Sequence, residues 1–216
     1  MKAFNFDEPT ERRGTGSYKW DSADADVIPL WVADMDFRTA PCIIEALSDR
    51  VRHGVFGYEK VPDAWYEALQ GWFARRHGWQ IRREEVLCTT GVVPAVSAVI
   101  KAFTRPGDGV ALMTPAYNCF FSSIRNNGCF AAETALLMGN AGWTIDFAAL
   151  EKTLADPRVK VFLFCSPHNP VGRVWTADEI RRTAQIAHQA GVLFVCDEIH
   201  GEFVFGGSRY LPAAQV

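Results

Sequence analysis

Four chemically useful groups each stand directly after a short apolar run of the sequence. They are the backbone at Gly91, the ring of Tyr117, the amide of Asn169 and the carboxylate of Asp197. In turn, these groups can bind an anion, stack on a flat ring, donate to an oxygen and neutralise a positive charge. One planar ligand would satisfy all four, namely a pyridine ring that carries a phosphate and a phenolic oxygen.

The segment TGVVPAV at residues 90–96 predicts the anion site. Its glycine leads from an apolar run into a helical stretch, which places free backbone N–H groups at the positive end of a helix. We expect Gly91, Val92 and Val93 to supply the donors. A single glycine is weak evidence, because the same residues also suit an ordinary turn between two elements.

The carboxylate of Asp197 is the most informative of the four groups. It follows the apolar run at residues 192–196, so we expect it to be buried, and a buried carboxylate requires a cation or several donors. Arg209 is the only lysine or arginine after Arg182, which favours a cationic ligand over a structural ion pair or a helix cap. A protonated pyridine nitrogen would be such a cation, and the protonated ring would withdraw electrons from a bound substrate.

Tyr117 and Asn169 complete the predicted site. Tyr117 follows Pro115 and would stack on the ring, although a packed core tyrosine fits the same sequence. Asn169 follows His168 between two prolines, which restrict the backbone, and its amide would bind the phenolic oxygen. An Asx turn would use the same asparagine and stays open as the alternative.

These groups require a fold that brings the ends of several strands together. Apolar runs predict strands at residues 86–89, 109–114, 130–137, 159–165 and 192–196. Helices are predicted at residues 41–53, 63–77 and 178–190, the last with a capping box of Thr176 and Glu179. Continuous apolar strands separated by helices predict an α/β fold with a mainly parallel sheet, whose ligand sites lie at the carboxyl ends of the strands.

Composition and charge limit the partners of the protein. The chain has 216 residues, of which 49% are hydrophobic and 22% charged, as in ordinary globular proteins. Its formal net charge of −3 gives no electrostatic basis for binding nucleic acid or an anionic membrane. The longest apolar runs are strand-sized and too short to span a bilayer. We therefore expect a small-molecule ligand.

Cysteine spacing and aromatic content bear on location and domain organisation. The six cysteines show no C-x-x-C spacing, which argues against a metal site and favours a reducing, cytoplasmic location. Residues 1–40 are rich in aromatic side chains and irregular, so they are predicted to form an N-terminal arm. Residues 41–216 are predicted to form one larger ligand-binding domain.

The apolar run that ends in Asp197 and Glu198 also resembles the Walker B strand of P-loop proteins. That class requires the motif G-x-x-x-x-G-K-[ST], and no glycine in this chain precedes a lysine. The dinucleotide motif G-x-G-x-x-G is absent as well. Both nucleotide-binding classes are therefore disfavoured.

Six segments of the sequence occur together in one order. They are WVADMDF at 31–37, GYEKVPDAW at 57–65, TTGVVPAV at 89–96, TPAYNCFF at 114–121, SPHNPVGRVW at 166–175 and CDEIH at 196–200. As a set they resemble the MalY/PatB family of pyridoxal-phosphate-dependent carbon–sulfur lyases, within the aminotransferase class I/II superfamily of fold type I. The resemblance covers the whole chain and implies that the planar ligand is pyridoxal 5′-phosphate.

The resemblance also adds site residues to the four groups. It implies that His200 lies near the phenolic oxygen of the cofactor, three residues after Asp197. It implies that Tyr58 crosses a homodimer interface to reach the phosphate bound by the neighbouring subunit. Ala33 and Asp34 match an arm that relatives bring close to the amino-acid substrate.

The activity implied by the resemblance is cleavage of cystathionine or a cysteine-like substrate to a thiol, pyruvate and ammonia. An aminotransferase of the same superfamily and a non-catalytic binding module remain the alternatives. The family requires a Schiff-base lysine in an S-x-S-K-like motif a few dozen residues after DEIH, and the last lysine here is Lys160. The catalytic residue is thus not identified. We expect the large domain to be incomplete at its C-terminus, the small C-terminal domain to be absent, and the chain to be inactive alone.

Overall fold

The computed structural model of the protein describes residues 4–140 and 142–216. The chain divides into two compact units, Met1–Val61 and Pro62–Val216. The predicted arm at 1–40 therefore shares a unit with the helix that follows it. None of the helices in the described part of the chain is long and apolar enough to cross a membrane.

The first unit is mostly irregular and holds two helices, α1 (Tyr18–Asp21) and α2 (Pro41–His53). Helix α2 has the predicted bounds, because proline suits its first turn and Gly54 follows its last residue in the left-handed region at φ 74°. Of the described residues of this unit, only Ser17, Lys19 and Pro29 are buried.

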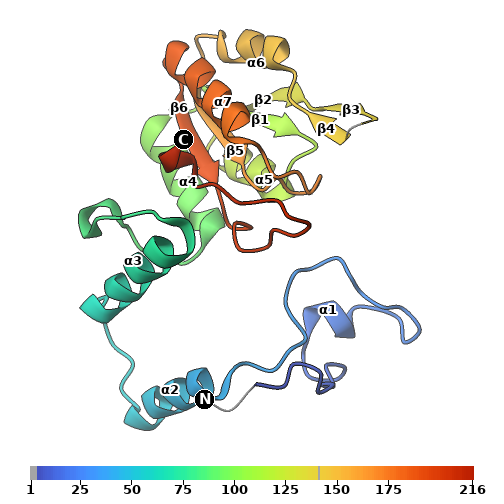
Figure 1. Cartoon of the computed structure of the whole chain (residues 1–216), viewed down its shortest axis with the longest axis vertical. Helices are drawn as coiled ribbons and strands as arrows, with labels where there is room; N and C mark the ends of the chain where they lie inside the picture. Colours follow the sequence, from blue (N-terminus) through green and yellow to red (C-terminus); the bar gives the residue numbers. More distant parts are fainter. Residues whose placement is uncertain (1–3, 141) are drawn as a thin grey trace. The chain divides into compact units, whose positions relative to one another are not determined.

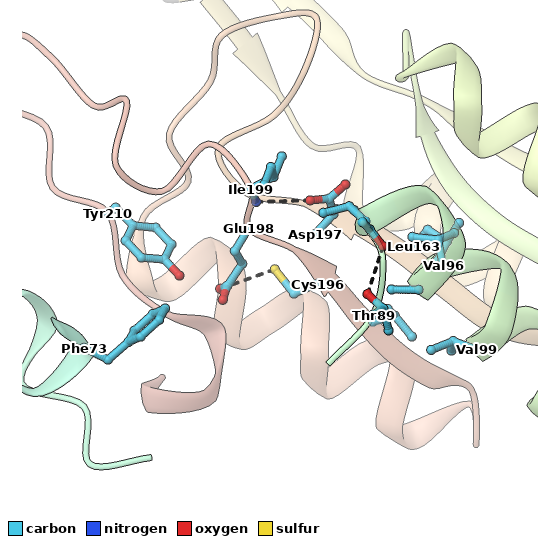
Figure 2. Close-up of a pocket in the computed structure, with 14 residues that line it drawn as sticks. Phe73, Thr89, Val96, Val99, Leu163, Cys196, Asp197, Glu198, Ile199 and Tyr210 are labelled. Carbon is cyan, nitrogen blue, oxygen red and sulfur yellow. Dashed lines mark hydrogen bonds between the residues drawn. The ribbon is translucent and has the colours of Figure 1, made fainter. Parts of the chain in front are cut away.

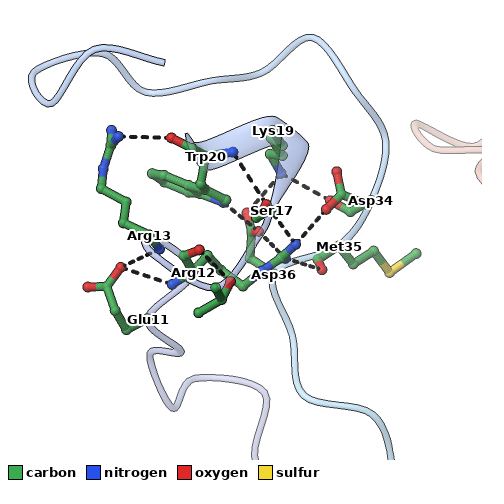
Figure 3. Close-up of polar contacts among 10 residues, drawn as sticks. Glu11, Arg12, Arg13, Ser17, Lys19, Trp20, Asp34, Met35 and Asp36 are labelled. Carbon is green, nitrogen blue, oxygen red and sulfur yellow. Dashed lines mark hydrogen bonds and ion pairs between the residues drawn. The ribbon is translucent and has the colours of Figure 1, made fainter. Parts of the chain in front are cut away.

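Polar contacts take the place of an apolar core in the first unit (Figure 3). The guanidinium of Arg12 donates to Asp36 Oδ1 and to Asp34 Oδ2, each at 2.7 Å, and to the backbone oxygen of Met35 at 3.0 Å. Lys19 Nζ donates to Asp36 Oδ2 at 2.9 Å and to the backbone oxygen of Asp34 at 3.0 Å. Two cations thus hold residues 34–36 against the segment around α1.

The second unit is built on a parallel four-stranded sheet (Figure 1). Its strands lie in the order β2 (Phe130–Ala135), β1 (Gly109–Thr114), β5 (Val159–Cys165) and β6 (Leu193–Asp197). The predicted α/β class with a parallel sheet is confirmed. A short antiparallel pair, β3 (Leu137–Gly139) and β4 (Gly142–Thr144), stands apart from this sheet.

Helices cover both faces of the sheet. They are α4 (Val92–Phe103) and α5 (Asn118–Asn126) on one face and α6 (Phe147–Leu154) and α7 (Ala177–Gln189) on the other. The second unit also contains helix α3 (Asp63–His77) and 3-10 turns at Arg83–Glu85 and Ala213–Gln215. Val110 and Leu112 of β1 pack in a cluster with α4 and α5, whereas Ala111 and Met113 pack in a cluster with α6 and α7. The alternation of side chains along one buried strand therefore supplies two separate cores.

Most predicted elements are confirmed, with small shifts. Strands β1 and β5 and helix α3 have the predicted bounds, while β6 and α7 are displaced by one residue. The capping box of α7 is present, since Thr176 Oγ1 accepts from Glu179 N–H at 3.2 Å and Glu179 Oε2 accepts from Thr176 N–H at 2.7 Å. The run predicted as a strand at 130–137 divides at Leu136, which follows β2 and precedes β3.

The strand predicted at residues 86–89 is wrong. Val86 has extended backbone angles, φ −111° and ψ 121°, but the structure assigns no strand there. Leu87 is 90% exposed, and within the described residues no strand pairs with this segment. An extended segment becomes a strand only through hydrogen bonds to a neighbour, which a local apolar pattern does not reveal.

Candidate functional site

The carboxyl ends of β1, β5 and β6 lie side by side. Leu112 of β1 pairs with Leu163 of β5, and Cys165 at the end of β5 pairs with Asp197 at the end of β6. Beyond the ladder, Ser166 N–H donates to the backbone oxygen of Asp197 at 2.9 Å. The loops that follow these three strands therefore begin at one edge of the sheet, the edge at which open α/β sheets bind ligands.

Asp197 is partly buried at this edge, as predicted. Its Oδ1 accepts one hydrogen bond, from Ile199 N–H at 3.1 Å, and among the described residues no lysine or arginine forms an ion pair with it. Burial raises the pKa of Asp197 above its ordinary value, and the Ile199 donor and the nearby His200 oppose that rise. The carboxylate is therefore desolvated and incompletely paired, which suits a cationic partner.

The N-terminus of α4 opens onto the same region. Gly91 is the N-cap at φ 145°, which is a backbone conformation that residues with a side chain rarely adopt. No side chain caps this helix, and its first turn contains no acidic residue. The first N–H groups of a helix have no partner within the helix, so those of Val92 and Val93 are suited to an anion.

An apolar cavity of about 490 Å³ lies between α4 and the end of β6 (Figure 2). Of the predicted site residues, Gly91, Val92 and Asp197 line it. The other lining residues are Phe73, Thr89, Ala95, Val96, Val99, Leu163, Val195, Cys196, Glu198, Ile199 and Tyr210. The residues predicted to bind an anion, Gly91 and Val92, thus line the same cavity as Asp197, which is predicted to pair with a cation. Val93 is exposed and does not line it.

One side of the cavity is formed by a close contact between the ring of Tyr210 and Gly201. Tyr210 is buried and lines the cavity with Phe73 and Glu198 (Figure 2). Its ring lies so near Gly201 that a β-carbon at that position would stand 2.8 Å from the ring. A side chain at residue 201 would therefore require the Tyr210 ring to shift.

Tyr117 lies at the end of the short loop after β1 and is the N-cap residue of α5. It is partly buried, and its ring meets Phe120 edge to face at a centroid distance of 5.8 Å. The pKa of Tyr117 is raised, first by Cys119, then by burial and by the charge of Asp197. The effect of Asp197 places the two side chains in one electrostatic environment.

Asn169 and His168 lie in the loop after β5. Asn169 is partly buried, and its amide forms no hydrogen bond within the part of the chain that the structure describes, so it is available to a ligand. His168 is buried, and its Nε2 lies 2.9 Å from the backbone oxygen of Pro115, two residues before Tyr117. His200 is partly buried beside Asp197, with its ring 6.5 Å from that of Phe203.

The remaining predicted residues belong to the first unit. Tyr58 is fully exposed there, and Ala33 and Asp34 lie in the segment beside Arg12. The Asp34 carboxylate is already paired with Arg12, and its backbone oxygen accepts from Lys19. A role for these three residues in binding substrate or phosphate stays a prediction.

Several residues of the site were not predicted from the sequence. Thr89, Glu198 and Tyr210 line the cavity, and His168 joins two loops that each carry a predicted ligand residue. The position of His168 between two prolines was a signal of a rigid loop, but its partner lies 53 residues away.

The chain is similar to known proteins over almost its whole length. Residues 25–216 match the aminotransferase class I and II family. The chain is 40% identical to cystathionine beta-lyase PatB of Bacillus subtilis, over 98% of this chain and 56% of that protein. It is also 40% identical to protein MalY of Escherichia coli, over 99% of this chain and 56% of that protein.

A solved structure agrees with the sequence comparisons. Cystalysin from Treponema denticola, whose crystal structure contains a pyridoxal 5′-phosphate cofactor, superposes with a TM-score of 0.91 at 37% identity. The match covers 98% of this chain and 55% of that one. The chain thus spans about half the length of the relatives it matches, and the resemblance predicted from the six segments is confirmed.

Proposed function

Because the chain belongs to the aminotransferase class I and II family, we propose that it forms the cofactor-binding part of a pyridoxal-phosphate-dependent carbon–sulfur β-lyase. The proposed substrate is cystathionine or a similar amino acid, and the products are a thiol, pyruvate and ammonia. Support comes from the similarity to cystathionine beta-lyases and from the polar groups that meet at the edge of the sheet.

The observation that carries the proposal is the state of Asp197. A partly buried carboxylate with a raised pKa is costly unless a cation pairs with it, and no lysine or arginine of residues 4–140 and 142–216 does so. A ligand would then have to supply the charge. A protonated pyridine nitrogen would supply it. When bound, the cofactor withdraws electrons from the substrate, and a negative group at its nitrogen maintains that capacity.

The other residues fit the rest of the cofactor. The N–H groups at Gly91, Val92 and Val93 would bind its phosphate at the uncapped start of α4. Tyr117 would stack on its ring, and Asn169, with His200 nearby, would bind its phenolic oxygen. These assignments use groups that have few partners within the described residues, so binding would replace few existing hydrogen bonds.

In the part of the chain that the structure describes, no lysine lines this site. Lys160 is the second residue of β5, and Asp197 pairs with the last residue of that strand, at its other end. The Nζ of Lys160 donates to the backbone oxygen of Pro157 at 2.6 Å. The 216-residue chain by itself is therefore expected to bind the cofactor without turning over substrate.

The proposal extends to assembly and location. A homodimer would bring Tyr58 of one subunit to the phosphate bound by the other, and Ala33 and Asp34 would approach the amino-acid substrate. The full exposure of Tyr58 is consistent with a role at an interface. A cytoplasmic location suits the six cysteines, all of which are unpaired thiols.

Binding of pyridoxamine 5′-phosphate tests the proposal, because this form lacks the aldehyde that reacts with surface lysines. We expect its fluorescence to report binding to the wild-type chain. Asp197→Asn should weaken that binding at least about tenfold, because a charge-assisted hydrogen bond is worth about 1.5–3 kcal/mol. The matched control is Asp178→Asn, since the Asp178 side chain is 92% exposed and should not affect binding. Equal affinity of wild type and Asp197→Asn would refute the assignment.

The aminotransferase alternative is favoured by the name of the matching family and differs in its need for a second substrate. For the whole protein, pyruvate release from cystathionine without an added oxo acid would support the lyase. Dependence of turnover on an oxo acid would support the aminotransferase.

A further inference from the structure

One side chain connects the loop after β1 to the loop after β5. His168 Nε2 lies 2.9 Å from the backbone oxygen of Pro115, across 53 residues of sequence. The loop after β1 carries Tyr117, and the loop after β5 carries Asn169. The two residues proposed to bind the ring of the cofactor are thus joined through a single hydrogen bond between their neighbours.

The surroundings of His168 fix which ring nitrogen carries the proton. A carbonyl oxygen only accepts, so Nε2 must be the donor to Pro115. Burial lowers the pKa of His168 and so favours the neutral ring, while contacts with the backbone of Pro115 and of Cys165 oppose that shift. Nδ1 is buried and has no hydrogen-bond partner among the described residues, so the ring makes its only side-chain hydrogen bond to Pro115.

The backbone of His168 is also held in place. Its N–H donates to the backbone oxygen of Arg173 at 2.8 Å, and its own oxygen accepts from Gly172 N–H at 2.8 Å. Its ring packs edge to face against buried Trp175 at a centroid distance of 5.7 Å. The imidazole is therefore held in one orientation, and its hydrogen bond to Pro115 restricts the motion of the loop that carries Tyr117.

We propose that His168 is a positioning residue that fixes the spacing between Tyr117 and Asn169 through its Nε2–H bond to Pro115. It touches neither cofactor nor substrate in this role. The proposal rests on the proposed function, because the value of that spacing is the fit to one planar ligand. A purely structural histidine would stabilise the fold without changing the loop of Tyr117 selectively.

Two substitutions of similar size separate the hydrogen bond from packing. His168→Gln places an amide donor near the position of Nε2, whereas His168→Met fills similar space without a donor. His188→Met is the matched control, because His188 is exposed on α7. Circular dichroism and thermal unfolding would establish that each variant is folded before binding is compared.

The first measurement is hydrogen exchange in residues 114–121. We expect His168→Met to raise exchange in this segment about tenfold, with His168→Gln and His188→Met close to wild type. The second measurement is the affinity for pyridoxamine 5′-phosphate. It should fall about three- to tenfold in His168→Met and be largely retained in His168→Gln, in line with the loss of one hydrogen bond.

The outcomes distinguish the two proposals. If wild type binds pyridoxamine 5′-phosphate and His168→Met matches His168→Gln in both exchange and affinity, the positioning role is overturned. If wild type does not bind, the proposed function fails, while the exchange measurement still decides whether His168 holds the loop. Nitrogen-15 shifts of the His168 ring that show a proton on Nδ1 would also overturn the proposal.

Discussion

The two units of the chain are stabilised by different kinds of interaction. In residues 62–216, two apolar clusters pack on opposite faces of the sheet, and side chains as large as Trp175 and Phe162 are fully buried. In the described part of residues 1–61, the buried side chains are few, and charged hydrogen bonds from Arg12 and Lys19 hold the segment together. The first kind of interaction scales with buried area, and the second depends on pH and salt.

The difference indicates how each unit should respond to its surroundings. The first unit leaves large apolar side chains in solvent, including Leu30 at 88% exposure and Phe56 at 70%. Apolar surface of this extent is typical of regions that pack against a partner. The second unit has the core of an ordinary domain, so its stability should be largely its own.

The largest expected effect is on the core of the second unit. Trp175 is 1% exposed, and its Nε1–H donates to the backbone oxygen of Cys165 at 2.9 Å. Trp175→Ala should lower the free energy of unfolding by about 3–5 kcal/mol, measured by urea denaturation. Trp31→Ala is the control in the first unit, where Trp31 is 59% exposed, and it should change stability little. Similar losses for both variants would contradict the comparison.

An intermediate effect is expected in the first unit. Arg12→Met removes the donors to Asp34, Asp36 and the backbone of Met35 while retaining an apolar stem. Limited proteolysis should cleave residues 4–40 several times faster, while urea unfolding of the second unit is unchanged. Arg181→Met is the control, because Arg181 forms only an exposed pair with Asp178. A parallel loss of stability in the second unit would show that the two regions are not independent.

The smallest expected effect is a gain in stability, and its size depends on pH. Burial raises the pKa of Asp197 above its ordinary value of 3.8, so the folded state binds more protons than the unfolded state between these two values. Stability therefore falls as pH rises through that interval, and the charged carboxylate destabilises the ligand-free chain at neutral pH.

Asp197→Asn should consequently raise the melting temperature of the ligand-free chain by about 2–4 °C at pH 7. The gain should vanish below about pH 3, where both states are protonated. Thermal scans at several pH values provide the measurement. A gain that persists unchanged at low pH would show that it arises from something other than the charge.

Local signals explain why much of the fold could be predicted from the sequence. The bounds of α2 follow from Pro41 and Gly54, and those of β5 from one continuous apolar run. The segment at 86–89 could not be predicted correctly, because its assignment as a strand requires a neighbour that local pattern does not show. A long, continuous apolar run such as β5 was therefore enough to predict a strand, whereas the short run at 86–89 was not.

The same distinction applies to the site. The partial burial of Asp197 could be predicted, because this residue ends an apolar run that forms strand β6. The contact between His168 and Pro115 spans 53 residues, and that between Arg12 and Asp34 spans 22, so neither has a signature in the local sequence. The position of a residue within a strand predicts how deeply its side chain is buried. Its hydrogen-bond partners from distant parts of the sequence become known only from the structure.

The approach of Tyr210 to Gly201 has an evolutionary consequence. A β-carbon at position 201 would displace the ring of Tyr210, which lines the cavity, so we expect glycine to be preferred there. Of the intervening residues, Glu202 is held by Trp72, Arg76 and His77, whereas residues 205–209 are exposed. Among descendants of this chain, we expect residues 205–209 to vary while Gly201 and Tyr210 change only together.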